Sequence, residues 1–263
     1  MMQRRRRSTD GSCRTARVLL VMSFLLALQL LSSCAKNPQK GGVDTFVAPN
    51  GRRIVITCIK HASLEINYRG KEFEIDPVFS AVRPIVDYTD KPQADYILVT
   101  HDHYDHFDMN AVFLLTKNNT QVFLTQRCFN RYQRGTVIRN GETYRLDTDM
   151  TLRAVPAYNL RPDHRSRHPR GVGNGYLLEL GGFRIYIAGD TELVPEMRYL
   201  GRVDVAFLPC DSANTMSIKE LRQSAKVIRP KVLYPYHLFF TPPAEVEKAL
   251  RGLGIEVRMR DLR

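Results

Sequence analysis

Histidine and aspartate residues crowd a short segment that follows an apolar run. Residues 100–106 read T-H-D-H-Y-D-H and include His101, His103, Asp105 and His106. The run before them, YILVT at residues 96–100, is typical of a strand that is buried on both faces. Two histidines at i and i+2 on a loop that leaves a strand can bind one metal ion, and the following Asp and His can turn toward a second ion about 3.5–4 Å away. The segment predicts a metal centre, since a chance surface cluster of so many imidazoles is uncommon.

The composition is that of a globular protein. The 263 residues are enough for one large domain or two small ones, with 43% hydrophobic and 25% charged residues, 16 Gly and 14 Pro. These values exclude disorder, collagen-like repeats and a multi-span membrane protein. The net charge of +12 is moderately basic. A net charge of this size is common on the surface of soluble proteins, so we expect no nucleic acid as a partner.

Strand patterns dominate, and the helices come late. We expect strands in residues 52–60, 63–70, 71–78, 96–100, 120–124, 151–158, 176–180, 183–188, 203–208, 233–237 and 255–260. Gly181-Gly182 predicts a hairpin turn. A short helix is expected near residues 111–116. Ser217 and Glu220 form a capping box for a second helix that Pro230 ends, and Thr241 is expected to cap a third. This pattern predicts one domain with two sheets and helices outside them.

The N-terminus has the features of an export signal. Six arginines within residues 1–17 precede the fourteen-residue apolar run Val18–Leu31, which is shorter than the roughly 20 residues of a spanning helix. Residues 31–34, L-S-S-C, resemble a bacterial lipobox in which Cys34 becomes the lipidated first residue. The alternative is an ordinary signal peptide with an incidental cysteine. We expect a signal peptide at 1–33, a tether at 34–50 and a folded domain at 51–263. The protein would be anchored in the bacterial cell envelope and face the periplasm or the exterior.

Three cysteines remain if Cys13 is removed and Cys34 is acylated. They are Cys58, Cys128 and Cys210. An odd number at irregular spacing does not indicate a disulfide framework. Cys58 and Cys210 lie in apolar runs, so we expect them to be buried hydrophobic residues.

The H-x-H-x-D-H motif, with Asp95 before its strand, resembles the metallo-β-lactamase superfamily. Further motifs carry the same resemblance: Asp76-Pro77 after KEFEI, Gly189-Asp190-Thr191 after FRIYIA, and His237 in LYPYH. More narrowly, KHASLEI, VPAYN, HPRGVGNGYLLEL and IAGDT resemble the branch that contains ascorbate-phosphate lactonase and N-acyl-phosphatidylethanolamine phospholipase D. The resemblance covers residues 54–237 and implies an α/β fold, the four-layer αββα sandwich.

The resemblance also implies a dinuclear metal hydrolase. His101 and His103 would bind one ion, Asp105, His106 and His237 the other, and Asp190 would bridge them. Zinc is the expected metal because His103 stands where diiron relatives carry an acidic residue; Mn²⁺ or Fe²⁺ are the other choices. A metal-bridging hydroxide would attack the substrate, and Asp105 would orient or deprotonate that water.

The third ligand of the first ion needs a separate argument. Lipase-like relatives have Pro-Ala-x-His where this chain has Asn159 in VPAYN. An amide oxygen is a poor zinc ligand beside imidazoles, so the third nitrogen should come from His164 or His168. We favour His168 because the HPRG that begins there resembles the His-Pro-Lys-Gly of relatives with Ala-Tyr-Asn. Asn159 would then hydrogen-bond nearby and could contact the substrate.

Several further residues could contact substrate. His61 belongs to KHASLEI, where Lys60 replaces a Gly common in the related branch, and a structural role for His61 is equally compatible with the sequence. Arginines follow the VPAYN segment and could bind an anionic substrate or form a solvated loop: Arg161, Arg165, Arg167 and Arg170. We expect the glycines at 171, 173 and 175 to let the backbone pass close to the metals.

The sequence predicts an exported, lipid-anchored hydrolase of an ester, lactone, amide or phosphodiester bond. Its partners would be the membrane and a small-molecule or lipid-like substrate, which could be an anion. One alternative is a nuclease of the same fold, against which export argues. Another is a non-catalytic metal-binding lipoprotein, against which the complete ligand set argues.

Overall fold

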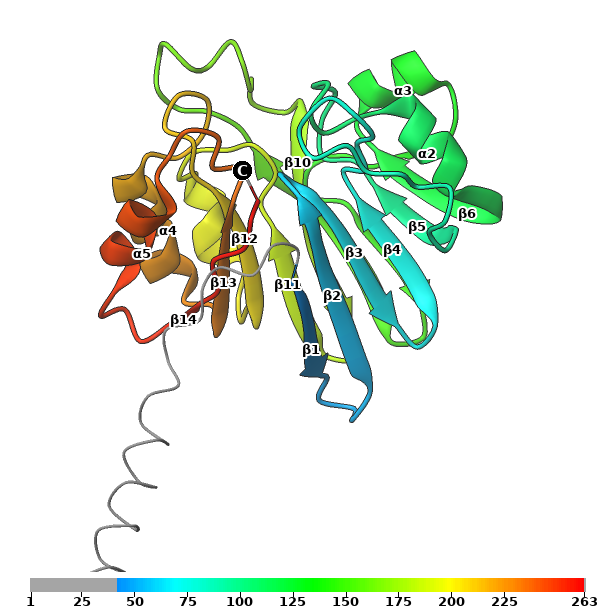
Figure 1. Cartoon of the computed structure of the whole chain (residues 1–263), viewed down its shortest axis with the longest axis horizontal. Coiled ribbons are helices and arrows are strands. Elements are labelled where there is room, and N and C mark those ends of the chain that lie inside the picture. Colours follow the sequence, from blue (N-terminus) through cyan, green and yellow to red (C-terminus); the bar gives the residue numbers. More distant parts are fainter. Residues whose placement is uncertain (1–41, 263) are drawn as a thin grey trace, which may run out of the picture. The chain divides into compact units, whose positions relative to one another are not determined.

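The computed structural model describes residues 42–262, and their strands form two seven-stranded sheets (Figure 1). The first sheet has the strand order β1 to β7. Its strands are β1 (Val43–Val47), β2 (Arg53–Lys60), β3 (Ser63–Tyr68), β4 (Lys71–Ile75), β5 (Ala94–Leu98), β6 (Thr116–Leu124) and β7 (Thr136–Val137). The pairs from β1 to β4 are antiparallel, and those from β4 to β7 are parallel.

The second sheet follows the same plan in the second half of the chain. Its strand order is β14-β13-β12-β11-β10-β9-β8. Its strands are β8 (Thr143–Asp147), β9 (Met150–Ala157), β10 (Gly173–Leu180), β11 (Phe183–Ile187), β12 (Val205–Pro209), β13 (Val232–Tyr236) and β14 (Glu256–Val257). Antiparallel pairing runs from β8 to β11, and parallel pairing from β11 to β14.

Helices cover the outer face of each sheet, which gives the predicted αββα order of layers. Helices α2 (Met109–Leu115) and α3 (Gln126–Tyr132) lie beside the first sheet, and α4 (Ile218–Ile228) and α5 (Pro243–Leu250) beside the second (Figure 1). A 3-10 helix, η1 (Pro195–Tyr199), packs against α4. The two helix pairs cover separate clusters of buried apolar side chains.

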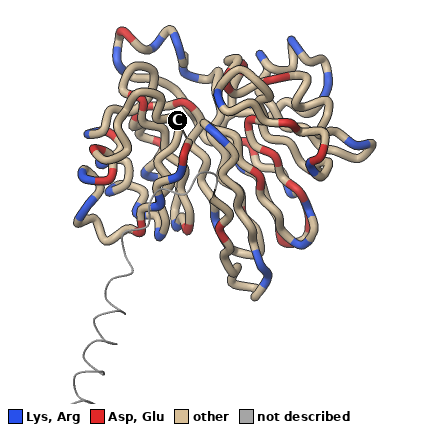
Figure 2. Tube along the Cα trace, viewed as in Figure 1, with Lys and Arg blue, Asp and Glu red and all other residues tan. Residues whose placement is uncertain are grey.

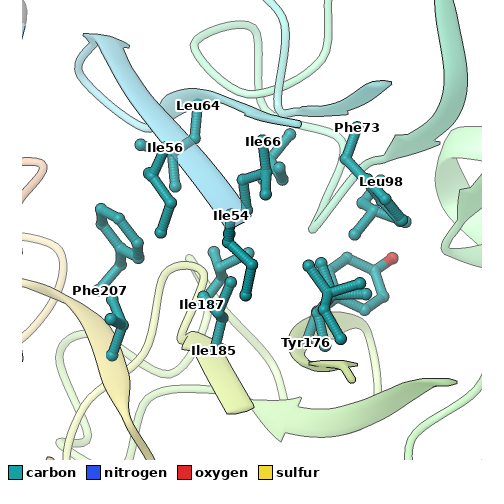
Figure 3. Packing of buried hydrophobic residues seen from close by; sticks show 14 of the residues in the cluster. Ile54, Ile56, Leu64, Ile66, Phe73, Leu98, Tyr176, Ile185, Ile187 and Phe207 are labelled. Carbon is teal, nitrogen blue, oxygen red and sulfur yellow. The ribbon is translucent and has the colours of Figure 1, made fainter. Parts of the chain in front are cut away.

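The main core lies between the two sheets. Alternate residues of β2, including Ile54 and Ile56, point toward the second sheet, because side chains of a strand alternate between its faces. They meet Ile185, Ile187 and Phe207 of the second sheet (Figure 3). The parallel strands β5, β12 and β13 are buried along their whole length. This explains why the sequences of β12 and β13 are continuously apolar and that of β5 is apolar apart from Asp95.

Two helix starts test the expected capping. Ser217 forms the predicted capping box with Glu220, and α4 ends at Ile228 before Pro230. The expected cap at Thr241 is wrong, because α5 begins only at Pro243, and Pro242 takes the cap position without a side-chain hydrogen bond. A residue that precedes a proline is disfavoured in the α region, which keeps Pro242 extended.

The expected tether, residues 34–50, differs from the structure in its last part. Residues 43–47 form β1, which pairs along its length with β2. Asp44 receives hydrogen bonds from Arg258, Arg260 and the Tyr234 hydroxyl, and these contacts fix β1 to the C-terminal segment. The folded domain therefore includes β1, upstream of the boundary expected at residue 51.

The expected signal peptide and Cys34 lie outside the described residues. Among residues 42–262, no helix has the length and apolar character needed to cross a membrane. Cys58, Cys128 and Cys210 are buried and unpaired, as predicted for Cys58 and Cys210, and burial raises the pKa of all three thiols to about 12. Basic and acidic residues are interspersed along the described chain (Figure 2).

Candidate metal centre

Two groups of potential metal ligands meet at the ends of the sheet strands. One group contains His101, His103, His168 and Asp190. The other contains His61, Asp105, His106 and His237. Within each group one ligand atom per residue lies within 4.8 Å of all the others. The structure thus brings together every residue that was predicted as a metal ligand, and adds His61.

Strand ends and one hairpin turn position these side chains. The segment with His101 and His103 leaves β5, Asp190 follows β11 and His237 follows β13. The carboxyl ends of parallel strands lie at the same edge of a sheet, and the two sheets bring their edges together here. His61 is in the turn between β2 and β3. His61 and His237 have positive φ angles of 45° and 53°, which are uncommon for residues other than glycine and cluster at functional sites.

Asp190 lies between the two groups. Its carboxylate oxygens are 3.2 Å from Nε2 of three histidines and 3.8 Å from Nε2 of a fourth: His106, His168 and His237, then His101. In the second group, Oδ2 of Asp105 is 3.3 Å from His61 Nε2 and 3.7 Å from His237 Nε2. Asp190 is therefore placed to contact ions in both groups.

The alternatives for the third nitrogen occupy different places. Nε2 of His168 is 3.3 Å from Nδ1 of His103 and faces the centre, whereas Nδ1 of His164 lies 3.1 Å from the buried carboxylate of Glu192. The Asn159 amide donates to the carbonyls of Asn214 and His164, and its nitrogen is 3.1 Å from His168 Nδ1. His168 thus has the position of a ligand. Asn159 lies behind it and does not line the pocket, so the substrate contact expected for Asn159 is wrong.

A buried carboxylate fixes the orientation of His106. Its Nδ1 donates to Oδ2 of Asp76 at 2.8 Å, and Asp76 also accepts from the backbone nitrogen and the hydroxyl of Thr100. This leaves Nε2 of His106 facing Asp190, at 3.2 Å from its Oδ1. Carboxylate–histidine pairs of this kind are typical behind metal ligands. The sequence indicated Asp76 only through its motif, since the contact with His106 joins residues 30 positions apart.

The charges of the centre require a cationic partner. Burial opposes ionisation of Asp190, but the imidazoles of His237 and His106 hold the pKa of its carboxyl well below the usual value. Burial would lower the pKa of His237, but the Asp190 carboxylate raises this pKa to about 9. The His106 pKa is raised for the same reason, again against the effect of burial. Protons on two histidines thus balance the carboxylates when no cation does so, and divalent ions could replace them.

Unsatisfied atoms show that the residues fit metal ions. Six buried atoms of the two groups have no hydrogen-bond partner among the described residues: Nδ1 of His61, Nε2 of His101 and of His106, both ring nitrogens of His237, and Oδ1 of Asp190. Buried polar atoms are normally hydrogen-bonded, so a cluster of exceptions indicates an absent partner. Imidazole nitrogens and carboxylate oxygens are the ligands that zinc takes.

His61 is a buried member of the second group. Its ring centroid is 4.0 Å from that of His237 and 4.7 Å from that of Phe239. Burial lowers the pKa of His61 to about 4, so the ring is neutral near pH 7. Its Nε2 then donates a hydrogen bond to Asp105, because an ionised carboxylate can only accept one.

An open pocket adjoins both groups. Its wall includes His103, Asp105, His168 and His237, together with Arg127 and Arg167. Arg170, expected at the substrate, is exposed instead, pairs with Glu196 at 2.9 Å and lies over the Tyr158 ring. Arg127 of α3 was not expected, because nothing in the sequence near it marks a site.

Close backbone approach explains two glycines near the centre. A Cβ on Gly173 would lie 3.1 Å from the Ala157 carbonyl oxygen and 3.8 Å from Cβ of His101. Gly189, which precedes Asp190, has a φ of 65° and would place a Cβ 2.7 Å from the Asn174 carbonyl oxygen. Side chains at these positions would displace the strand ends that carry the ligands, as expected for Gly173.

Comparison with known proteins agrees with this fold. The chain matches the family described as the β-lactamase superfamily domain over residues 55–237. A UPF0173 metal-dependent hydrolase of Ligilactobacillus salivarius (strain UCC118) is 33% identical over 198 residues, which cover 72% of this chain and 86% of that protein. Another from Archaeoglobus fulgidus is 29% identical over 219 residues, covering 78% and 94% of the two chains.

Solved structures give the same result. A Parabacteroides distasonis ATCC 8503 protein, assigned to the metal-dependent hydrolases, is 40% identical, with a TM-score of 0.81 over 85% of this chain and 100% of that one. Igni18, a metallo hydrolase of Ignicoccus hospitalis, is 23% identical with a TM-score of 0.68 over 80% and 95% of the chains, and shows the shared fold. The chain therefore belongs to the β-lactamase superfamily and, within it, to the family of metal-dependent hydrolases.

Proposed function

We propose that this protein is a dinuclear metal-dependent hydrolase that uses zinc and water to cleave an ester, lactone, amide or phosphodiester bond. The observation that carries the proposal is the pair of buried ligand groups with Asp190 between them. His101, His103 and His168 would hold one ion, Asp105, His106 and His237 the other, and Asp190 would contact both. Bound divalent cations lower the pKa of water toward 7 and polarise the oxygen of the scissile bond.

Asp105 is the proposed catalytic residue. Its side chain lines the pocket and is in the second ligand group, so its carboxylate can orient the attacking water and accept its proton. His61 donates to Oδ2 of Asp105, which leaves the other oxygen free for the water. His61 is thus a positioning residue for Asp105. The water supplies the nucleophile, so no serine or cysteine needs to attack the substrate, and the described cysteines are all buried and unreactive.

Metal content and turnover together test this function. Protein purified without chelators is expected to contain close to two transition-metal ions per chain by elemental analysis. Screening of esters, lactones, amides and phosphodiesters should identify a substrate class, and a chelator should abolish its turnover. Asp105→Asn should lose turnover while the fold survives, as judged by circular dichroism. Protein that contains no metal and takes none up would refute the proposal, and normal turnover in Asp105→Asn would remove Asp105 from the mechanism.

We further propose that the protein is a lipoprotein of the bacterial cell envelope, with Cys34 as its anchor. The basic start, the apolar run Val18–Leu31 and the L-S-S-C sequence support this. A diacylglyceryl group supplies two acyl chains, enough for stable anchoring where one chain is marginal. Cys34→Ser should shift the protein to the soluble fraction or leave the precursor unprocessed. Unchanged processing and membrane partition in this variant would contradict the proposal.

A further inference from the structure

Two guanidinium groups stand at the pocket without a protein partner. Arg127 of α3 and Arg167 of the loop before β10 both line the open pocket beside the ligand groups, and both also line a smaller pocket with His101 and His168. Both residues are exposed. Within residues 42–262, neither side chain has a hydrogen bond, ion pair or aromatic contact.

The other arginines of α3 and of the loop before β10 are engaged by the protein. Arg161 pairs with Glu192, and Arg170 with Glu196. Arg165 donates to the Leu160 carbonyl, and Arg131 donates to the Asp102 carbonyl. Arg127 and Arg167 therefore differ from the other arginines of these two segments.

The local charge balance favours an anion at these two residues. Asp105 and Asp190 are the carboxylates on the wall of the open pocket, and both belong to the ligand groups, where metal ions would neutralise them. The smaller pocket adds Asp102, which forms no ion pair with either arginine. Two unpaired positive charges thus face the space next to the proposed reaction centre.

We propose that the substrate is an anion whose carboxylate or phosphate is bound by Arg127 and Arg167 while its scissile bond lies over the metal ligands. This inference rests on the proposed hydrolase function and adds the substrate class. The planar donor fork of arginine matches the oxygens of both groups. Tyr104 and Phe239 line the same pocket and provide an apolar wall for the body of the substrate.

A matched pair of esters tests the proposal. 4-Nitrophenyl hexanoate and 4-nitrophenyl hydrogen adipate share the leaving group and acyl length, and only the adipate ends in a carboxylate. The protein should prefer the adipate by about tenfold in kcat/KM, as expected for charge-assisted hydrogen bonds to exposed arginines. The double variant Arg127→Gln/Arg167→Gln should lose this preference through KM, with kcat and hexanoate turnover unchanged. Added NaCl should raise KM for the adipate only.

Arg170→Gln is the matched control, because Arg170 is in the same loop as Arg167 but is paired with Glu196. It should retain the preference for the adipate. Equal kcat/KM values for the two esters in the unmodified protein would overturn the inference. An equal loss for both esters in the double variant would also overturn it, because that pattern indicates a structural role.

A binding measurement separates this inference from the proposed function. Titration calorimetry with inorganic phosphate and, separately, adipate, on protein freed of metal by a chelator, should detect binding that the double variant lacks. The stronger ligand of the two identifies the anionic group. Anion binding by the metal-free protein, with no hydrolysis of any substrate by the metal-loaded protein, would support the anion site and refute the hydrolase. Hydrolysis without arginine-dependent binding or preference would support the hydrolase and refute the anion site.

Discussion

At the scale of single residues, several histidines use Nδ1 to contact a neighbouring protein group. Their Nε2 atoms then stay available to a metal ion. Nδ1 of His106 is bonded to Asp76, Nδ1 of His168 faces the Asn214 carbonyl at 3.2 Å, and Nδ1 of His101 is 3.0 Å from the Thr100 hydroxyl. Such partners fix the tautomer and the ring orientation. The geometry of the centre therefore depends on residues that would not touch the metal.

The first prediction concerns Asp76. Asp76→Asn removes the carboxylate that holds His106, so metal affinity should fall by about 10- to 100-fold, the usual effect of losing such a partner. Competition with a chromophoric chelator measures this. Asp95→Asn is the control, because Asp95 pairs with Lys71 and Lys117 away from the centre. Equal affinities for Asp76→Asn and the unmodified protein would show that His106 does not need this contact.

The second prediction distinguishes His168 from His164. His168→Ala should lower the metal content from about two ions to about one, since it removes a nitrogen that faces Asp190 at 3.2 Å. His164→Ala should leave the metal content unchanged, because that ring lies against Glu192. Elemental analysis of both variants gives the answer. Loss of metal in His164→Ala alone would assign the ligand to His164.

At the scale of elements, a buried lysine fixes the long connection between β4 and β5. Lys60 is the last residue of β2 and is fully buried. Its Nζ donates to the carbonyls of Phe79, Val82 and Pro84, at 2.9, 2.7 and 2.8 Å. Three donors of an ammonium group are thus matched by three acceptors. Lys60 stands where the related branch commonly has Gly, and its contacts attach the connection to the turn that carries His61.

The third prediction follows from these three contacts. Lys60→Met keeps the aliphatic length but leaves the carbonyls without their donor, so the free energy of unfolding should fall by about 3 kcal/mol. Urea denaturation at fixed metal loading measures it. Lys71→Met is the control: its side chain is 41% exposed and pairs with Asp95, so it should change stability by less than about 1 kcal/mol. Similar values for the two variants would show that Lys60 is not required for this connection.

At the scale of the whole molecule, the ligands come from both sheets. His101 and Asp105 follow β5 of the first sheet, and Asp190 and His237 follow strands of the second. Any ion bound by these residues links the two sheets at one edge. Metal binding should therefore contribute to the stability of the entire domain, because the unfolded chain does not bring these residues together.

The fourth prediction is that metal removal lowers the melting temperature. An ion present at 1,000 times its Kd contributes about 4 kcal/mol, which corresponds to roughly 10 °C in a domain of this size. Calorimetry before and after treatment with a chelator, and after zinc is added back, measures the change and its reversal. An unchanged Tm in protein shown to have lost its metal would mean that the ions do not connect the sheets energetically.

The sequence by itself determined the features that depend on neighbours along the chain. The T-H-D-H-Y-D-H segment, the apolar strand before it and the capping box of Ser217 and Glu220 all lie within a few residues, so spacing and residue type were enough. The fold and the distant residues Asp190 and His237 were identified through motifs that resemble a family. The structure confirms the fold, and the metal-binding roles of the distant residues remain predictions for the experiments above.

Tertiary structure decided what depends on contacts across the chain. The sequence of residues 43–47 is compatible with a tether. In the structure these residues form a strand because they pair with β2 and because Arg258 forms an ion pair with Asp44. Arg127 has no local signal, and only the packing of α3 against the first sheet brings it to the pocket. The two halves share one sheet plan without an evident sequence repeat, because many apolar sequences satisfy the same alternation. The spacing of residues along the chain determines which ligand types lie together, whereas the packing of the two sheets decides which distant charged residues stay unpaired beside the metal centre.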